Sequence, residues 1–146
     1  MMQTRAQELV MKGGRVAGVE AVDSDGNIIK INANKGVVIA SGGFGANVKL
    51  RMKYDTLWNG MLDDKFKTTN SPAITGDGIL MAQKIGADVK GIGKIQLLVG
   101  DPNTGVTSTL VGMSTSMYVN REGKRLVNEL ERRDNLVKAI LAQPGN

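Results

Sequence analysis

Two glycine-rich stretches and one cluster of charges hold the residues that could do chemistry in this chain. The first stretch, Ser41-Gly42-Gly43, follows Ala40 at the end of the apolar run GVVIA. Backbone without side chains lets a ligand or another segment approach to van der Waals contact. A tight turn would use the same residues, so the motif alone leaves both interpretations open. It does not have the GxGxxG spacing of a dinucleotide pyrophosphate loop.

The second stretch, Thr75-Gly76-Asp77-Gly78, opens the segment TGDGILMAQKIGA, which has the period of an amphipathic helix. The first turn of a helix has unpaired N–H groups and the positive end of the dipole, so it can bind anionic or carbonyl oxygens. The plainer interpretation is an ordinary N-cap by Thr75 or Asp77, with Gly86 ending the helix in the left-handed conformation.

The charge cluster lies in VNREGKRLVNELERRD, where Arg133 has Glu129, Glu131 and Asp134 close by in sequence. An arginine held by carboxylates can bind an anionic substrate with two parallel hydrogen bonds. On one continuous helix, Glu129 and Arg133 would share a face. A solvated hairpin followed by a helix start is the alternative.

The sequence patterns of the segments that must position these motifs predict an α+β fold. Alternating residues with a turn at Asp25-Gly26 predict a β-meander, and Val37 to Ile39 predicts a strand covered on both faces. Residues 5–11 fit a strand or a helix equally. Short helices, an irregular segment and a hairpin are expected in this order: helix 47–53, irregular 54–74, helix 75–86, hairpin 117–129 and a last helix cut short by Pro144.

Composition excludes several classes of function. The 146 residues include no cysteine and no histidine, so no thiolate nucleophile, histidine base or zinc–thiolate site is available, and no metal site is expected. One Trp, two Tyr and two Phe are too few for an aromatic platform that stacks single-stranded nucleic acid. The charge of +5 is dispersed, which does not predict a nucleic-acid partner.

No apolar run is long enough to span a membrane, and the N-terminus has no signal-peptide core. A cytoplasmic location is expected, although a longer parent protein could be exported.

The order and spacing of three runs carry a resemblance. These runs are VVIASGGFGAN, TTNSPAITGDGILMAQKIGA and VNREGKRLVNELERRDNLVKAILAQ. Over residues 13–142 the chain resembles flavoprotein subunits of the fumarate reductase and succinate dehydrogenase superfamily. Within it, the chain is most similar to the soluble flavocytochrome-type fumarate reductases and their relatives, the urocanate reductases and ketosteroid dehydrogenases.

The resemblance implies an FAD-dependent oxidoreductase that exchanges hydride with a C=C bond of a small unsaturated substrate. It implies that residues 1–96 are the middle segment of a discontinuous FAD-binding domain and that residues 97–146 begin a capping domain. Arg133 matches the proton-donating arginine of the family. The positions that match cofactor-binding segments are Ala40, Ser41, Gly42, Gly43, Thr75, Gly76, Asp77 and Gly78.

The chain also departs from the family. It has no substrate-binding histidine, and Ser108-Thr109 stands where the family has a Thr-Glu pair. The sequence therefore favours another unsaturated substrate over fumarate.

Without a GxGxxG segment, the chain alone is expected to be inactive and to bind FAD weakly or not at all. Two alternatives remain at this stage: a non-catalytic, self-associating truncated product, and a small nucleotide-binding module.

Overall fold

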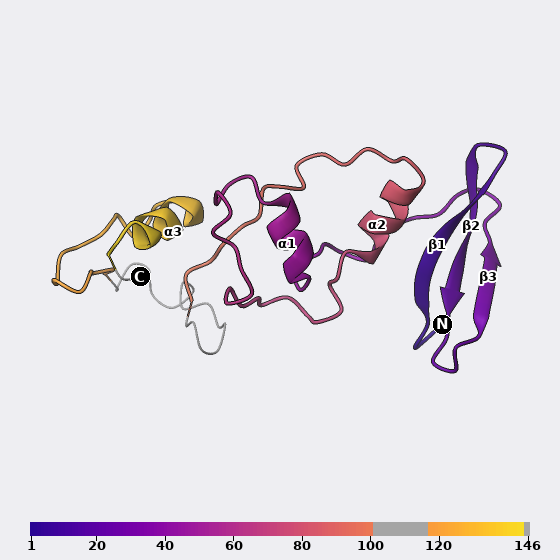
Figure 1. The fold of residues 1–146 in the computed structure, drawn as a ribbon, viewed down its shortest axis with the longest axis horizontal. Coiled ribbons are helices and arrows are strands. Elements are labelled where there is room, and N and C mark those ends of the chain that lie inside the picture. Colours follow the sequence, from indigo (N-terminus) through magenta and orange to yellow (C-terminus); the bar gives the residue numbers. More distant parts are fainter. Residues whose placement is uncertain (101–116, 145–146) are drawn as a thin grey trace. The chain divides into compact units, whose positions relative to one another are not determined.

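The computed structural model describes residues 1–100 and 117–144. Within them the chain forms three strands and three helices (Figure 1), which confirms the α+β prediction. Their bounds are β1 (Arg5–Lys12), β2 (Arg15–Val22), β3 (Ile28–Asn32), α1 (Val48–Tyr54), α2 (Asp77–Lys84) and α3 (Arg133–Leu141). The chain divides into two compact units, Met1–Asp55 with Asn70–Gly93 and Thr56–Thr69 with Lys94–Asn146.

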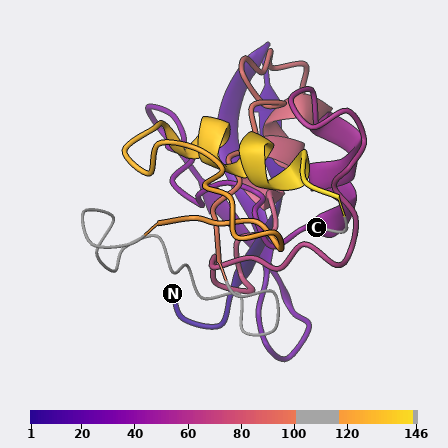
Figure 2. The ribbon, with the colours of Figure 1, turned by 90° about the vertical axis from the view of Figure 1, so that its left-hand side faces the viewer.

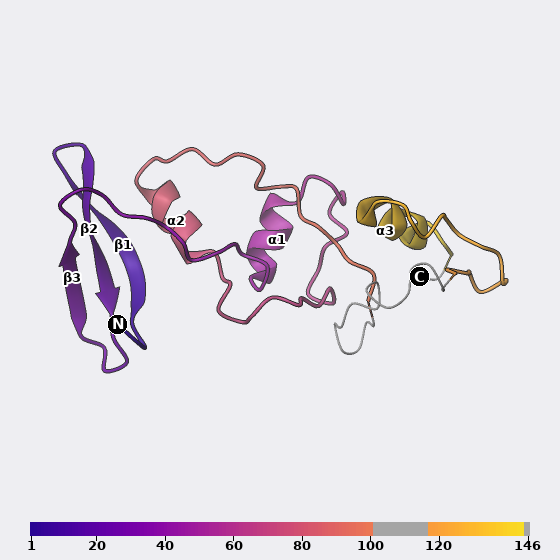
Figure 3. The same cartoon turned by 180° about the vertical axis from the view of Figure 1, so that it is seen from behind.

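The first unit contains an antiparallel meander in the order β1-β2-β3, with β2 in the middle (Figures 1 and 3). The predicted turn between β2 and β3 is confirmed. Asp23 accepts hydrogen bonds from the backbone N–H of Asp25 and Asn27, and Gly26 has a φ of 85°. Residues 5–11, which the sequence left undecided, belong to strand β1 because they pair with β2. Local turn chemistry and period-2 alternation therefore account for this sheet.

The predicted strand Val37 to Ile39 is wrong for this chain. The segment is not in a strand, and the Val38 side chain is 91% exposed. A β-branched apolar run forms a strand only if a neighbouring segment completes its hydrogen bonds. None of the described residues pairs with this run, because the sheet ends at β3.

The helices of the first unit are where the sequence predicted them, but one cap differs. Asn47 caps α1 by accepting a hydrogen bond from Leu50 N. The N-cap of α2 is Gly76, in the left-handed conformation and without a side-chain cap, so the prediction of a cap by Thr75 or Asp77 is wrong. The polar side chains of those two residues bond to each other instead. Gly86 follows the end of α2 with a φ of 87°, as predicted.

The second unit has its own small core of Trp58, Leu62 and Val137. Trp58 Nε1 donates a hydrogen bond to the carbonyl of Ile95 at 2.8 Å. Residues 54–74, from which Trp58 and Leu62 come, contain no helix or strand after Tyr54, as predicted. The predicted hairpin is confirmed by an antiparallel bridge between Val119 and Arg125.

The last helix, α3 (yellow in Figure 2), runs from Arg133 to Leu141 and so ends before Pro144, as predicted.

Candidate functional site

The two glycine-rich stretches meet within the first unit. A Cβ atom added to Gly78, in the first turn of α2, would lie 2.5 Å from Ile39 Cγ2 and closer still to the hydroxyl of Ser41. One added to Gly42 would lie 3.2 Å from Ile74 Cδ1. The structure thus brings residues 40–43 and 75–78 together, although they are far apart in sequence.

Burial separates the predicted site residues into two groups. Ala40, Ser41, Gly42 and Gly43 are all exposed, and a Cβ at Gly43 would meet nothing within 4 Å. Gly76 and Gly78 are buried, while Thr75 and Asp77 are intermediate.

The buried glycines make room for this chain's own side chains. A Cβ at Gly76 would lie 2.8 Å from both Leu50 Cδ1 and Phe44 Cβ. The close approach that TGDG permits is therefore made by α1 and by the segment around Ser41. The backbone that remains open to an external ligand is that of residues 40–43.

A hydrogen-bonded frame connects the start of α1 to the loop before α2. The side-chain amide of Asn47 donates to the carbonyl of Thr75 at 3.0 Å, while its oxygen caps α1. The backbone N–H of Ala46 donates to the carbonyl of Ile74 at 3.0 Å. Because Phe44 to Asn47 follow the exposed glycines directly, this frame fixes one end of the candidate site. The sequence marked Asn47 only as the beginning of a helix.

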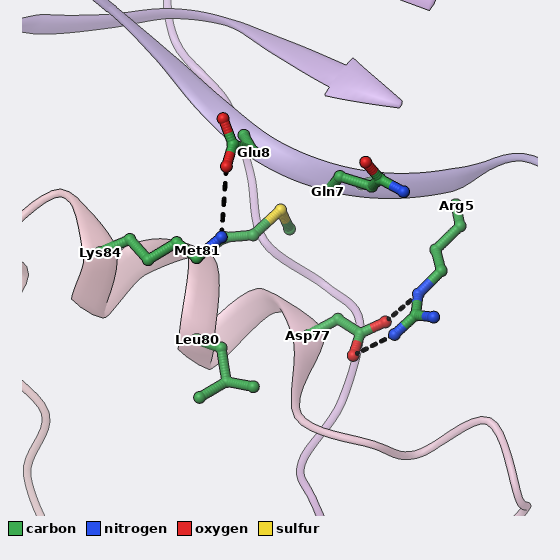
Figure 4. Close-up of a pocket in the computed structure, with 8 residues that line it drawn as sticks. Arg5, Gln7, Glu8, Asp77, Leu80, Met81 and Lys84 are labelled. Atoms are coloured by element: carbon green, nitrogen blue, oxygen red, sulfur yellow. Dashed lines mark hydrogen bonds and ion pairs between the residues drawn. The ribbon is translucent and has the colours of Figure 1, made fainter. Parts of the chain in front are cut away.

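Asp77 is bound by strand β1 as well as by its own loop (Figure 4). Arg5 donates from Nε to Oδ2 at 2.8 Å and from a terminal nitrogen to Oδ1 at 3.1 Å. The Thr75 hydroxyl donates to Oδ1 at 2.9 Å. The hydrogen bond from Arg5 is the main cause that lowers the pKa of Asp77, and the same pair raises the pKa of Arg5. At pH 7 the pair is fully charged.

An open groove of about 330 Å³ lies between β1 and α2 (Figure 4). The four charged side chains that line it are paired with each other, Arg5 with Asp77 and Lys84 with Glu8 at 3.2 Å. The positive and negative charges of the groove therefore compensate each other in two ion pairs.

Arg133 is the first residue of α3 and is exposed. The prediction that neighbouring acids hold it is wrong. Glu129 accepts hydrogen bonds from Arg125 and from Tyr118 N, and Asp134 pairs with Arg132. Glu131 accepts from Asn135.

The start of α3 explains this outcome. Since α3 begins only at Arg133, Glu129 is not on that helix and cannot share a helix face with Arg133. The guanidinium of Arg133 has no partner among residues 1–100 and 117–144. The pair Ser108-Thr109 lies outside the described residues.

Comparisons with known proteins agree with this geometry. A family model described as an FAD binding domain matches residues 1–146. The chain is 46% identical to the NADH:acrylate oxidoreductase of Vibrio harveyi over 145 residues, and 39% identical to the urocanate reductase of Eggerthella lenta over 146 residues. These alignments cover 97% and 96% of this chain.

A solved structure shares the fold. The open conformation of a flavocytochrome c3 fumarate reductase superposes with a TM-score of 0.71 at 33% identity, over 97% of this chain and 25% of that one. The chain also spans only 14% of the Vibrio relative and 23% of the Eggerthella relative.

Among the described residues, no helix has the length and apolar character that a membrane span requires.

Because a family model matches its whole length, the chain belongs to the FAD-binding domain family, among the fumarate-reductase-like flavoenzymes.

Proposed function

We propose that this chain supplies one wall of the FAD site of a longer flavoenzyme that reduces or forms a C=C bond. The observation that carries the proposal is the exposed backbone of Gly42 and Gly43, which directly follows Ser41, the residue that packs against Gly78 in the buried start of α2. In a chain that belongs to the FAD-binding domain family, such backbone is suited to contact with the cofactor.

The residues present fit an FAD molecule at this place. Gly43 is exposed and has space where a Cβ would stand, and Gly42 has a φ of 76°, which favours glycine. The backbone of Ala40 to Gly43 would contact the cofactor, while Thr75 to Gly78 would support this segment from behind. When bound, FAD supplies hydride transfer to or from a carbon centre.

Arg133 is the residue of this chain that we assign to proton transfer. Its guanidinium would donate a proton to the substrate carbon next to the one that exchanges hydride. The family resemblance of the segment NELERRD supports this role. The guanidinium of an arginine is a very weak acid in water, so such a donor must lose solvent when substrate binds. In the described structure the side chain is exposed and is free of acidic partners.

The proposed substrate is a small molecule whose C=C bond is conjugated with a carboxylate or another carbonyl group. The relatives described above are an acrylate oxidoreductase, a urocanate reductase and a fumarate reductase, and their three substrates share this feature. The absence of histidine from the sequence favours a substrate other than fumarate.

We also propose that the FAD-binding part extends over residues 1–96 and that a capping domain begins in residues 97–146. The end of the first compact unit at Gly93 supports a boundary in this region. Residues 56–69 pack with the second unit, so the chain crosses between the units more than once.

Self-association of the isolated chain is a further part of the proposal. Val38 and Ile39 are 91% and 44% exposed, and bare apolar segments with unpaired backbone tend to find partners. Light scattering should show oligomers that Val38→Lys reduces. A monomer at a protein concentration of tens of micromolar would exclude self-association.

A segment exchange tests the function itself. The stretch of the Vibrio harveyi NADH:acrylate oxidoreductase that aligns over 145 residues is replaced by this chain, and FAD per polypeptide is measured by absorbance. We expect the folded chimera to retain FAD at the level of the unmodified enzyme. A folded chimera without flavin would contradict the proposal.

A further inference from the structure

We propose that Arg5 is a positioning residue for FAD binding, and that it acts through Asp77 without touching the cofactor. This inference rests on the proposed function. It assigns to strand β1 a part in holding in place the cofactor wall, by which we mean the exposed backbone of residues 40–43.

The geometry shows what Asp77 is used for. Arg5 bonds to both of its carboxylate oxygens, at 2.8 and 3.1 Å, and the Thr75 hydroxyl bonds to one of them at 2.9 Å. Figure 4 shows the carboxylate pointing toward the Arg5 side chain. A carboxylate engaged in three hydrogen bonds within the chain has a structural part to play, because moving it to a ligand would break them.

The start of α2 needs such an anchor. Its N-cap is Gly76, which has no side chain with which to cap the helix. Arg5 lies on a strand that is fixed along its length to β2, so the ion pair ties a glycine-flanked helix start to a sheet.

The first turn of α2, which Arg5 anchors, supports the proposed cofactor wall at residues 40–43. Gly78, one residue after Asp77, is packed against Ser41 and Ile39. A displacement of this turn would therefore shift the backbone of residues 40–43.

A second ion pair between the same two elements provides a matched control. Lys84, in the last turn of α2, pairs with Glu8 of β1 at 3.2 Å, and both side chains are more than 60% exposed. Its removal takes one charge pair from the same β1–α2 contact but leaves the start of the helix anchored. The two pairs together include every charged group that lines this groove.

The experiment compares Arg5→Gln, Arg5→Lys, Asp77→Asn, the double variant Arg5→Gln/Asp77→Asn, and the control Lys84→Gln. Hydrogen exchange of the Leu80 amide, which closes the first turn of α2 by donating to the Gly76 carbonyl at 3.0 Å, is measured in this chain. The FAD dissociation constant is measured in the complete flavoprotein that contains it. The flavin content of the unmodified flavoprotein is determined first, so a protein that holds no FAD refutes the proposed function before any variant is compared.

We expect Arg5→Gln to speed exchange of the Leu80 amide and to weaken FAD binding, each about fivefold, which is the effect of losing about 1 kcal/mol of anchoring. Arg5→Lys should recover part of both losses, because it keeps the charge. Lys84→Gln should leave both quantities unchanged. If Arg5 acts only through Asp77, the double variant should lose no more affinity than the single Asp77→Asn variant.

Three results would overturn the inference. One is an unchanged FAD dissociation constant in Arg5→Gln, even if exchange becomes faster, because the pair would then be structural only. Another is exchange at the start of α2 that is unprotected in the unmodified chain or unaffected by Arg5→Gln. The third is additive loss of affinity in the double variant, which would mean that Arg5 affects FAD binding by a route other than Asp77.

Discussion

Gly78 is packed directly against Ser41, so that no side chain fits between α2 and the segment that precedes α1. This contact joins the two glycine-rich stretches into one structure. The glycines of the two stretches nevertheless differ in exposure. Gly78 is buried by the chain's own atoms, whereas Gly42 and Gly43 remain exposed. A glycine motif that looks uniform in sequence therefore contains positions needed for folding and positions available to a ligand.

Gly78→Ala should destabilise the first unit. The new Cβ would meet the Ser41 hydroxyl and lie 2.5 Å from Ile39 Cγ2, and overpacking of this kind costs about 1–3 kcal/mol of unfolding free energy. Urea denaturation followed by circular dichroism measures the loss. Gly43→Ala is the matched control, since its Cβ meets nothing within 4 Å. Equal midpoints for the two variants would contradict the packing described.

Acid should weaken the second unit through Glu129. The hydrogen bond from Arg125, helped by backbone N–H donors, lowers the pKa of Glu129 from 4.5 to about 2. A carboxylate with a depressed pKa stabilises the fold at pH values above 4.5, and this contribution is lost as the pH falls toward 2.

Trp58, the only tryptophan of the chain, lies in the same unit, so its fluorescence can follow this acid transition. In Glu129→Gln the stability of the unit should depend less on pH across this window. The control Glu131→Gln, whose partner is the exposed Asn135, should titrate as the unmodified chain does. An identical acid transition in Glu129→Gln and the unmodified chain would refute the role of this pair.

Trp58→Phe tests the core of the second unit. The indole N–H donates to the Ile95 carbonyl at 2.8 Å from a side chain that is 3% exposed. Phe keeps much of the apolar contact but leaves that carbonyl without its donor, so we expect a loss of about 1–3 kcal/mol of unfolding free energy. Thermal unfolding measured by circular dichroism gives the value. A change below about 0.5 kcal/mol would mean that water replaces the indole as the donor.

Arg133→Lys tests the proposed proton donor in the complete flavoprotein. Lysine keeps the positive charge but lacks the planar guanidinium group. We expect C=C reduction to fall by about a hundredfold or more, as when a positioned general acid is lost, with FAD content unchanged. Arg132→Lys, one residue away and paired with Asp134, is the control and should stay within about threefold of the unmodified rate. Similar rates in both variants would show that Arg133 is an ordinary surface residue.

The sequence predicted those parts of the fold that depend on local interactions. The meander follows from alternation and from the Asp25-Gly26 turn, and α2 follows from its period and from Gly86. It could not predict the pairing of Arg5 with Asp77, because the two residues are 72 positions apart and no local pattern connects them.

Two errors have the same kind of physical cause. The run Val37 to Ile39 has strand composition, but pairing partners decide whether a strand forms, and composition does not reveal them. The acids around Arg133 are near it in sequence, but α3 starts too late to place Glu129 beside it, and Arg125 takes that carboxylate instead. For the candidate site, residue types marked the two glycine-rich segments, but only burial in the folded chain shows which of their glycines remain exposed.

The most direct test of the central claim is the FAD dissociation constant of Gly43→Val in the complete flavoprotein, measured by flavin fluorescence. Gly43 is exposed, with no atom within 4 Å of an added Cβ, so the fold should tolerate valine there. The control Ser24→Val places the same side chain in the exposed turn between β2 and β3. If residues 40–43 form the cofactor wall, Gly43→Val should weaken FAD binding by about tenfold or more, at unchanged unfolding temperature, while Ser24→Val binds as the unmodified protein does. An affinity for Gly43→Val within about twofold of the control would contradict the account.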